Sequence, residues 1–145
     1  MSRTSASKPI AFISYSIKDN KYGAAVREAL NALNVESFLA HNDLRVSDKW
    51  EKKILREVGR CNVFVPLLSK NFLKTERCSQ ETGIIVKRRG VTIFPLLLDE
   101  TMPFGFIRIV QGQKVTLDEI DEELFLRPLA EKFPRYIFPQ WIDRV

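Results

Sequence analysis

The sequence predicts an α/β fold, a flavodoxin-like doubly wound parallel sheet of about five strands with helices on both faces. Three observations predict it. Short apolar runs alternate along the chain with stretches whose apolar residues recur at helical spacing. Two runs, residues 61–68 and 91–98, are almost continuously apolar, which is typical of strands covered on both faces. The alternation of strand and helix also implies right-handed crossover connections, and such connections join parallel strands.

In the first half of the chain, residues 10–14 form a short run rich in β-branched and aromatic residues, and residues 35–39 are a second strand candidate. A helix is predicted between them, starting at a capping-box-like segment over residues 16–19. Its apolar face consists of Tyr22, Val26, Ala29, Leu30 and Leu33. After a polar loop, Asp48 and Glu51 form another capping box. The second helix then shows one face marked by Trp50, Ile54 and Val58.

Each of the two buried strands contains a proline, Pro66 and Pro95. Because proline cannot donate to the strand ladder, we expect Pro66 near the strand end or at a local irregularity. Between the strands, a polar connector at residues 69–77 leads into a helix at residues 78–89, which is closed by Gly90.

The last part of the chain is predicted to begin with an irregular loop at residues 99–113 and a short strand at residues 114–117. Thr116 and Glu119 then cap a helix. Pro128 is expected to end or kink that helix.

The composition is that of an ordinary globular protein, with 145 residues, 45% of them hydrophobic and 28% charged. We expect a disordered lead-in at residues 1–8, one domain at residues 9–132 and an aromatic tail at residues 133–145 that packs on the domain. The formal net charge of +5 favours polyanionic or phosphorylated partners only weakly. We expect no nucleic-acid partner.

Several other classes of protein are disfavoured. The apolar runs are shorter than the roughly 20 residues of a membrane helix, and residues 1–7 lack the apolar core of a signal peptide. We therefore expect a cytoplasmic protein with no membrane partner. In that compartment Cys61 and Cys78 are expected to be buried thiols. His41 is the single histidine, so a metal site or a Ser/His/Asp triad is disfavoured.

The fold class predicts where a ligand would bind. In doubly wound sheets, ligands lie outside the carboxyl ends of the strands, where the strand order reverses. Here that crevice is expected between the first and third strands. Residues 14–16 and the segment from Ser69 onward, including the start of the helix that carries Glu81, are placed there.

Four segments together resemble the TIR (Toll/interleukin receptor) domain family. Residues 12–16, Phe-Ile-Ser-Tyr-Ser, with Asp19 resemble its first box, and residues 43–50 resemble its BB loop leading into the second helix. Residues 69–72 with Cys78-Ser-Gln-Glu81 resemble the third box region, and residues 94–99 resemble the fourth strand. The matches run in order from Ile10 to about Leu117 and imply the TIR fold.

The resemblance implies either an NAD⁺-cleaving enzyme, as in bacterial and plant members, or an assembly module, as in animal adaptors. The catalytic glutamate of the enzymatic members corresponds to Glu81. Two positions depart from the pattern: Arg77 stands where a tryptophan is usual, and Ser47 stands where the BB loop usually has glycine. Arg77 can still stack on a ring or meet a phosphate.

One carboxylate can suffice for this chemistry. Ordinary glycosidases use two because the leaving oxygen must be protonated. The nicotinamide of NAD⁺ leaves as a neutral molecule, so Glu81 would only have to stabilise the positive charge that develops on the ribose. Neither a cofactor nor a metal is expected, and NAD⁺ is the substrate. The expected substrate-binding residues are Ser14, Tyr15, Asp43, Trp50 and Arg77.

Each of these residues also has a purely structural interpretation. A glutamate in the first turn of a helix is favoured by the helix dipole alone. Ser14 can be a turn residue, Tyr15 and Trp50 can be core aromatics, and Asp43 can be a solvated loop charge.

The leading hypothesis is an NAD⁺ glycohydrolase or cyclase of bacterial immune signalling, acting with a separate effector or sensor protein. The resemblance implies self-association through the BB loop, residues 40–48. The alternative is a non-enzymatic module that works through TIR to TIR contacts. A response-regulator-like receiver ranks last, because Ser14, Tyr15 and Ser16 stand where its acidic pair would follow the first strand.

Overall fold

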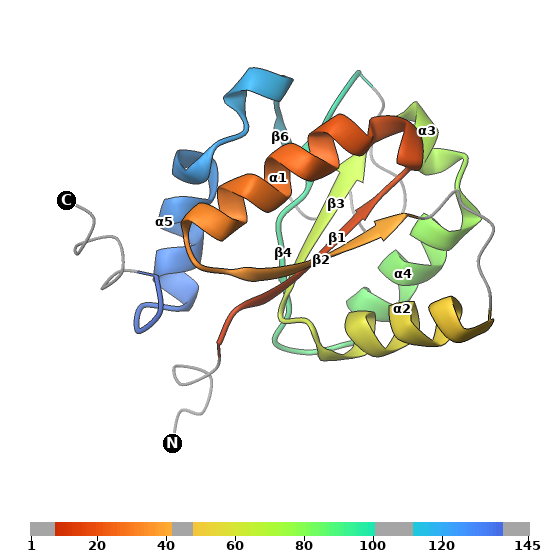
Figure 1. Cartoon of the computed structure of the whole chain (residues 1–145), viewed down its shortest axis with the longest axis horizontal. Helices are drawn as coiled ribbons and strands as arrows, with labels where there is room; N and C mark the ends of the chain where they lie inside the picture. Colours follow the sequence, from red (N-terminus) through yellow and green to blue (C-terminus); the bar gives the residue numbers. More distant parts are fainter. Residues whose placement is uncertain (1–7, 42–47, 101–111, 138–145) are drawn as a thin grey trace.

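The computed structural model describes residues 8–41, 48–100 and 112–137 (Figure 1). Residues 1–7, most of the predicted BB loop, the segment 101–111 and residues 138–145 therefore lie outside the described residues.

The predicted parallel α/β sheet is confirmed. Its order is β2-β1-β3-β5-β6, with β4 paired to β3, and every pairing is parallel. The strands are β1 (Ile10–Tyr15), β2 (Glu36–His41), β3 (Val63–Leu68), β4 (Thr92–Ile93), β5 (Leu96–Leu97) and β6 (Gln113–Lys114). The order reverses at β1 and β3, which leaves their carboxyl ends side by side.

The fourth predicted strand is divided into β4 and β5 by Phe94 and Pro95. β4 pairs with Val63 and Phe64, and β5 pairs with Leu67 and Leu68. The gap falls opposite Pro66. Because neither proline has an N–H to donate, the two interrupt the ladder at one place, and Pro66 marks the irregularity that the sequence predicts.

The helices cover both faces of the sheet (Figure 1). Helices α1 (Asn20–Ala32) and α5 (Glu122–Lys132) share one core cluster, and α2 (Asp48–Arg60) and α4 (Glu76–Val86) share another. Short turns of helix complete the chain: η2 (Ile17–Asp19), α3 (Lys70–Leu73) and η4 (Leu117–Glu119). Strand β1 serves both faces, since alternate side chains point to opposite sides.

The face beneath α1 and α5 is filled mostly by aliphatic residues, with Tyr15, Phe125 and Phe133 among them. Ala11, Ile13 and Tyr15 of β1 enter it with Val26 and Leu30 of α1. The tail contributes to the same core, where Phe133 and Ile137 are buried and Tyr136 packs against the cluster.

The face beneath α2 and α4 is built on a row of rings. Phe64, Phe12 and Phe38 follow one another across β3, β1 and β2, with ring centroids 5.9 Å and 5.5 Å apart. Trp50 of α2 continues the row, 5.7 Å from Phe38. Because Trp50 stands in this row, it has the core contact that its helical spacing suggests.

Two helix predictions between β3 and β4 need correction. The connector at residues 69–77 contains α3, which begins where the Ser69 hydroxyl caps the Phe72 N–H. Helix α4 begins at Glu76 rather than at residue 78 and ends at Val86, before Gly90, whose φ of 79° lies in the left-handed region that glycine favours.

The end of the chain differs as well. Thr116 and Glu119 do form a capping box, but the helix that they cap is the single turn η4. A separate N-cap, Asp121, starts α5. Helix α5 continues through Pro128 to Lys132, so this proline does not end the helix.

Candidate active site

Glu81 of α4 contacts Ser14 of β1 at the switch point, the place between β1 and β3 where the strand order reverses. The Ser14 hydroxyl donates a 2.7 Å hydrogen bond to the Glu81 carboxylate, and the two residues are 0% and 1% exposed. They are 67 positions apart in the chain. The contact exists because β1 ends next to β3, whose following segment leads into α4.

Glu81 occupies a core position of its helix. The inward face of α4 consists of Cys78, Glu81, Thr82 and Ile85, which recur at helical spacing. Since α4 begins at Glu76, Glu81 lies in the second turn and points to the sheet. The helix dipole acts mainly within the first turn, so it does not explain an acid here. Glu76 is the acid that fits that structural role.

Among the described residues, Glu81 is the only Asp, Glu, Lys or Arg that is buried. The other buried polar residues are all hydroxyl-bearing: Ser14, Ser16, Ser69, Thr75 and Thr82. Burying a carboxylate is costly unless it is bonded or used in chemistry. A buried carboxylate oriented by a hydroxyl can stabilise a cation that forms beside it.

The structure places Tyr15 on the opposite face of the sheet from Glu81. The tyrosine is 1% exposed, and a Cβ added at Gly23 of α1 would lie 3.1 Å from its ring. A strand turns successive side chains to opposite faces, so Ser14 and Tyr15 cannot both face α4. Tyr15 therefore packs in the core under α1 rather than in the crevice with Glu81.

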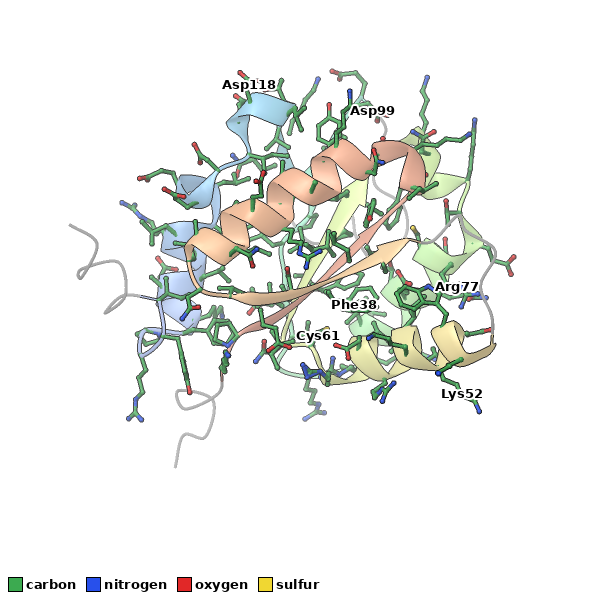
Figure 2. All side chains as sticks on the ribbon, in the orientation of Figure 1. Phe38, Lys52, Cys61, Arg77, Asp99 and Asp118 are labelled. Carbon is green, nitrogen blue, oxygen red and sulfur yellow. The ribbon has the colours of Figure 1, made fainter. Side chains whose placement is uncertain are left out.

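Arg77 precedes Glu81 by one helical turn but is directed to α2 (Figure 2). Its guanidinium forms an ion pair of 3.3 Å with Glu51, and its side chain is 21% exposed. Glu51 belongs to the first turn of α2. The salt bridge therefore joins the amino-terminal ends of the two helices on this face.

Asp43, the other expected substrate contact, lies outside the described residues.

A second polar group lies at the same sheet edge. Its segment from Ser69 onward was expected there, whereas Asp19 and Asp99 were not among the expected site residues. Asp19, after β1, accepts hydrogen bonds from Ser69 at 2.6 Å and Asn71 at 3.2 Å, both after β3. Asp99, after β5, accepts the Lys70 N–H at 3.1 Å. Each acid follows the carboxyl end of a strand, and this position in the sequence could have indicated that both acids lie at the same sheet edge. These bonds tie together the segments that follow β1, β3 and β5.

The cysteines are free and buried, as the sequence predicts. Burial raises the pKa of the Cys61 thiol to about 11, although the Arg88 guanidinium beside it acts in the other direction. Cys61 is therefore a protonated thiol at neutral pH and a poor nucleophile.

The described ranges hold no group of three or more His, Cys, Asp or Glu residues that could bind a metal ion. Within them there is also no helix with the length and apolarity needed to cross a membrane.

Comparisons with known proteins agree with this architecture. The chain is similar to the TIR domain of the Toll-related receptor TRR-2 from Hydra magnipapillata, with a TM-score of 0.65 and 17% identity over 83% of this chain and 94% of that one. It is also similar to the TIR domains of the activated Roq1 resistosome directly recognising the pathogen effector XopQ, with a TM-score of 0.52 and 16% identity over 90% of this chain and 77% of that one.

No curated protein matches the chain. At such low identities the solved structures show the fold alone. A family model described as TIR domain matches residues 11–126, which is well over half of the chain. The chain therefore belongs to the TIR domain family.

Proposed function

We propose that this chain cleaves the bond between nicotinamide and ribose in NAD⁺, with Glu81 as the catalytic carboxylate. The observation that carries the proposal is the position of Glu81: buried on the inward face of α4, at the switch point, and held by Ser14 at 2.7 Å. The family resemblance points to the same residue.

The reaction needs little from the protein besides electrostatics and position. The C1′–N bond breaks, its electron pair leaves with nicotinamide, and the ribose becomes an oxocarbenium-like cation. Glu81 stabilises that cation. Water then adds at C1′ and loses a proton to give ADP-ribose, or a hydroxyl of the same molecule adds at C1′ and loses its proton to give a cyclic isomer.

Ser14 acts in this proposal as a positioning residue. Its hydroxyl occupies one oxygen of the Glu81 carboxylate and fixes the orientation of the side chain. A preorganised charge needs no reorganisation when the cation forms, which is the main advantage of such a site over water. In this proposal Arg77, one turn earlier and partly exposed, exchanges its ion pair with Glu51 for a phosphate of the substrate.

The proposal extends to the biological setting. The product serves as a signal in cytoplasmic bacterial immune signalling, read by a separate effector protein, and self-association through residues 40–48 raises the activity. The competing function is a non-enzymatic adaptor. It is favoured by Arg77, which stands where enzymatic members carry tryptophan and which pairs with Glu51.

The decisive experiment incubates the protein at high concentration with NAD⁺ and separates nicotinamide, ADP-ribose and cyclic isomers. Glu81→Gln keeps the side-chain volume and an acceptor for Ser14, so it should fold but release no nicotinamide above background. Glu76→Gln is the matched control, because it removes an exposed acid from the same helix. Equal release by wild type and Glu81→Gln would refute the mechanism. An inert wild type, even when crowded, would favour the adaptor.

A further inference from the structure

Helix α2 presents an exposed row of positive charge. Lys49, Lys52, Lys53 and Arg56 are all exposed, and Lys52 projects away from the body of the domain (Figure 2). Lys49, Lys53 and Arg56 line a hollow with Trp50. Leu55, 49% exposed, lies among them. We call these residues the cationic face of α2.

The two acids of α2 whose side chains the structure describes do not neutralise this face. Glu51 pairs with Arg77 of α4, and Glu57 pairs with Arg60. In the part of the chain that the structure describes, no ion pair involves the four cations of the face. Lys49 and Lys53, like Lys52 and Arg56, are like charges four residues apart, an arrangement that destabilises a helix. An acidic partner would relieve that repulsion.

The chain carries a surface of the opposite charge and similar size on η4 and the first turn of α5. Its acids are Asp118, Glu119, Asp121, Glu122 and Glu123, of which all but Glu122 are exposed. Leu117, 41% exposed, lies beside them. We call this the acidic face of η4. Each charged face thus contains one of the exposed large apolar side chains of the described residues, Leu55 and Leu117.

The two faces cannot meet within one molecule. Asp118 and Lys52 project from opposite sides of the domain (Figure 2), and the sheet with its helices lies between them. We propose that the cationic face of α2 docks on the acidic face of η4 of a second copy of this chain. Leu55 and Leu117 would pack together in the contact, and the opposite charges would surround them.

The symmetry of such a contact has a consequence. Two different surfaces meet, so the contact is heterologous, and each copy keeps a free face at either end. Successive copies then form an open chain or a closed ring. The contact uses α2 itself rather than residues 40–48, and it does not depend on NAD⁺ cleavage. Its strength should fall with added salt, because exposed charges are screened.

Charge substitution tests the proposal. Lys52→Glu with Arg56→Glu cancels the net charge of the four cations of the cationic face. Asp118→Lys with Glu123→Lys removes most of the negative charge of the acidic face and leaves the caps at Glu119 and Asp121 intact. Sedimentation velocity from micromolar to millimolar protein, at low salt and without NAD⁺, should show concentration-dependent assembly of the wild type. Each variant alone should assemble at least about tenfold more weakly, since most of the attraction between the two faces is removed.

An equimolar mixture of the two variants should form one-to-one dimers, because the unaltered cationic face of one variant can bind the unaltered acidic face of the other, and these dimers should not extend further. Lys87→Glu with Arg89→Glu is the matched control: it makes the same change in net charge, at exposed positions outside both faces, and should assemble like the wild type. Glu81→Gln should assemble normally, which separates this proposal from catalysis. A monomeric wild type throughout the range, a mixture that stays monomeric, or α2 variants that assemble like the control would overturn the proposal.

Discussion

Helices α2 and α4 cover the same face of the sheet but use their inward positions differently. In α2 these positions hold Ile54 and Val58, with the half-buried Trp50 against Phe38. In α4 they hold Cys78, Thr82 and Ile85, and also Glu81. The core therefore accepts wholly apolar side chains on this face. The buried carboxylate of α4 departs from that apolar pattern, and the proposed chemistry accounts for it.

The largest expected effect on stability comes from α2. Ile54→Ala removes a side chain that is 1% exposed and leaves a cavity, so the free energy of unfolding should fall by about 2–5 kcal/mol. Denaturant titration measures it. Nicotinamide release per folded molecule should stay unchanged. A large loss of release at constant folded fraction would show that α2 also contributes to the chemistry and would erase the contrast between the two helices.

The junction at the far ends of the two helices should be sensitive to alkali. Arg88, after α4, donates to the carbonyls of Val58 and Cys61 at 2.8 Å and 2.7 Å. The folded-state pKa of the Cys61 thiol, about 11, lies above its ordinary value of 9.0. The neutral thiol is therefore favoured by folding, and its contribution is complete below pH 9 and lost as the pH rises toward 11.

The loss should amount to about 2 kcal/mol in the free energy of unfolding. Cys61→Ala removes the titrating group, so the difference between its stability and that of the wild type should change over this pH range. A difference that stays constant from pH 8 to pH 11 would contradict the assignment.

Ser14→Ala tests whether Glu81 must be held in place. The hydroxyl bonds the carboxylate directly, so its loss should lower kcat by about tenfold, with a smaller change in KM, because the interaction matters most as charge develops. Ser14→Thr keeps the hydroxyl and should recover part of the rate. A variant with a wild-type kcat would mean that Ser14 has only a structural role.

The smallest expected effect belongs to the bridge between the helices. Glu51→Gln breaks the ion pair with Arg77, and because Glu51 is 46% exposed its contribution to stability should stay below about 1 kcal/mol. A double-mutant cycle with Arg77→Met isolates the pair. A coupling well above that value would show that the bridge fixes the geometry of α4.

Much of the fold is predictable from the sequence because periodicity encodes burial. The apolar runs become the central strands, and Val26, Leu30, Ile54 and Val58 lie inward as predicted. The errors arise where side chains compete with these patterns. Ser69 caps a helix in a segment that is polar enough to suggest a loop. Pro128 is retained within α5.

The site was predictable in part. The switch-point rule predicts that the end of β1 and the helix carrying Glu81 meet, and Ser14 bonds Glu81. Tyr15 lies on the other face because successive side chains of a strand alternate, so Ser14 and Tyr15 could not both line the same side of the sheet. The Arg77–Glu51 pair was not predictable, because sequence spacing does not show how α2 and α4 align.

The most direct test of the account measures nicotinamide release and the free energy of unfolding in parallel for Glu81→Gln and Glu76→Gln. Glu81→Gln should lose activity by at least about a hundredfold. It should unfold no more easily than the wild type, because a buried charge has become neutral. Glu76→Gln should resemble the wild type in both. A destabilised Glu81→Gln variant that still releases nicotinamide at the wild-type rate would show that Glu81 belongs to the fold and not to the chemistry.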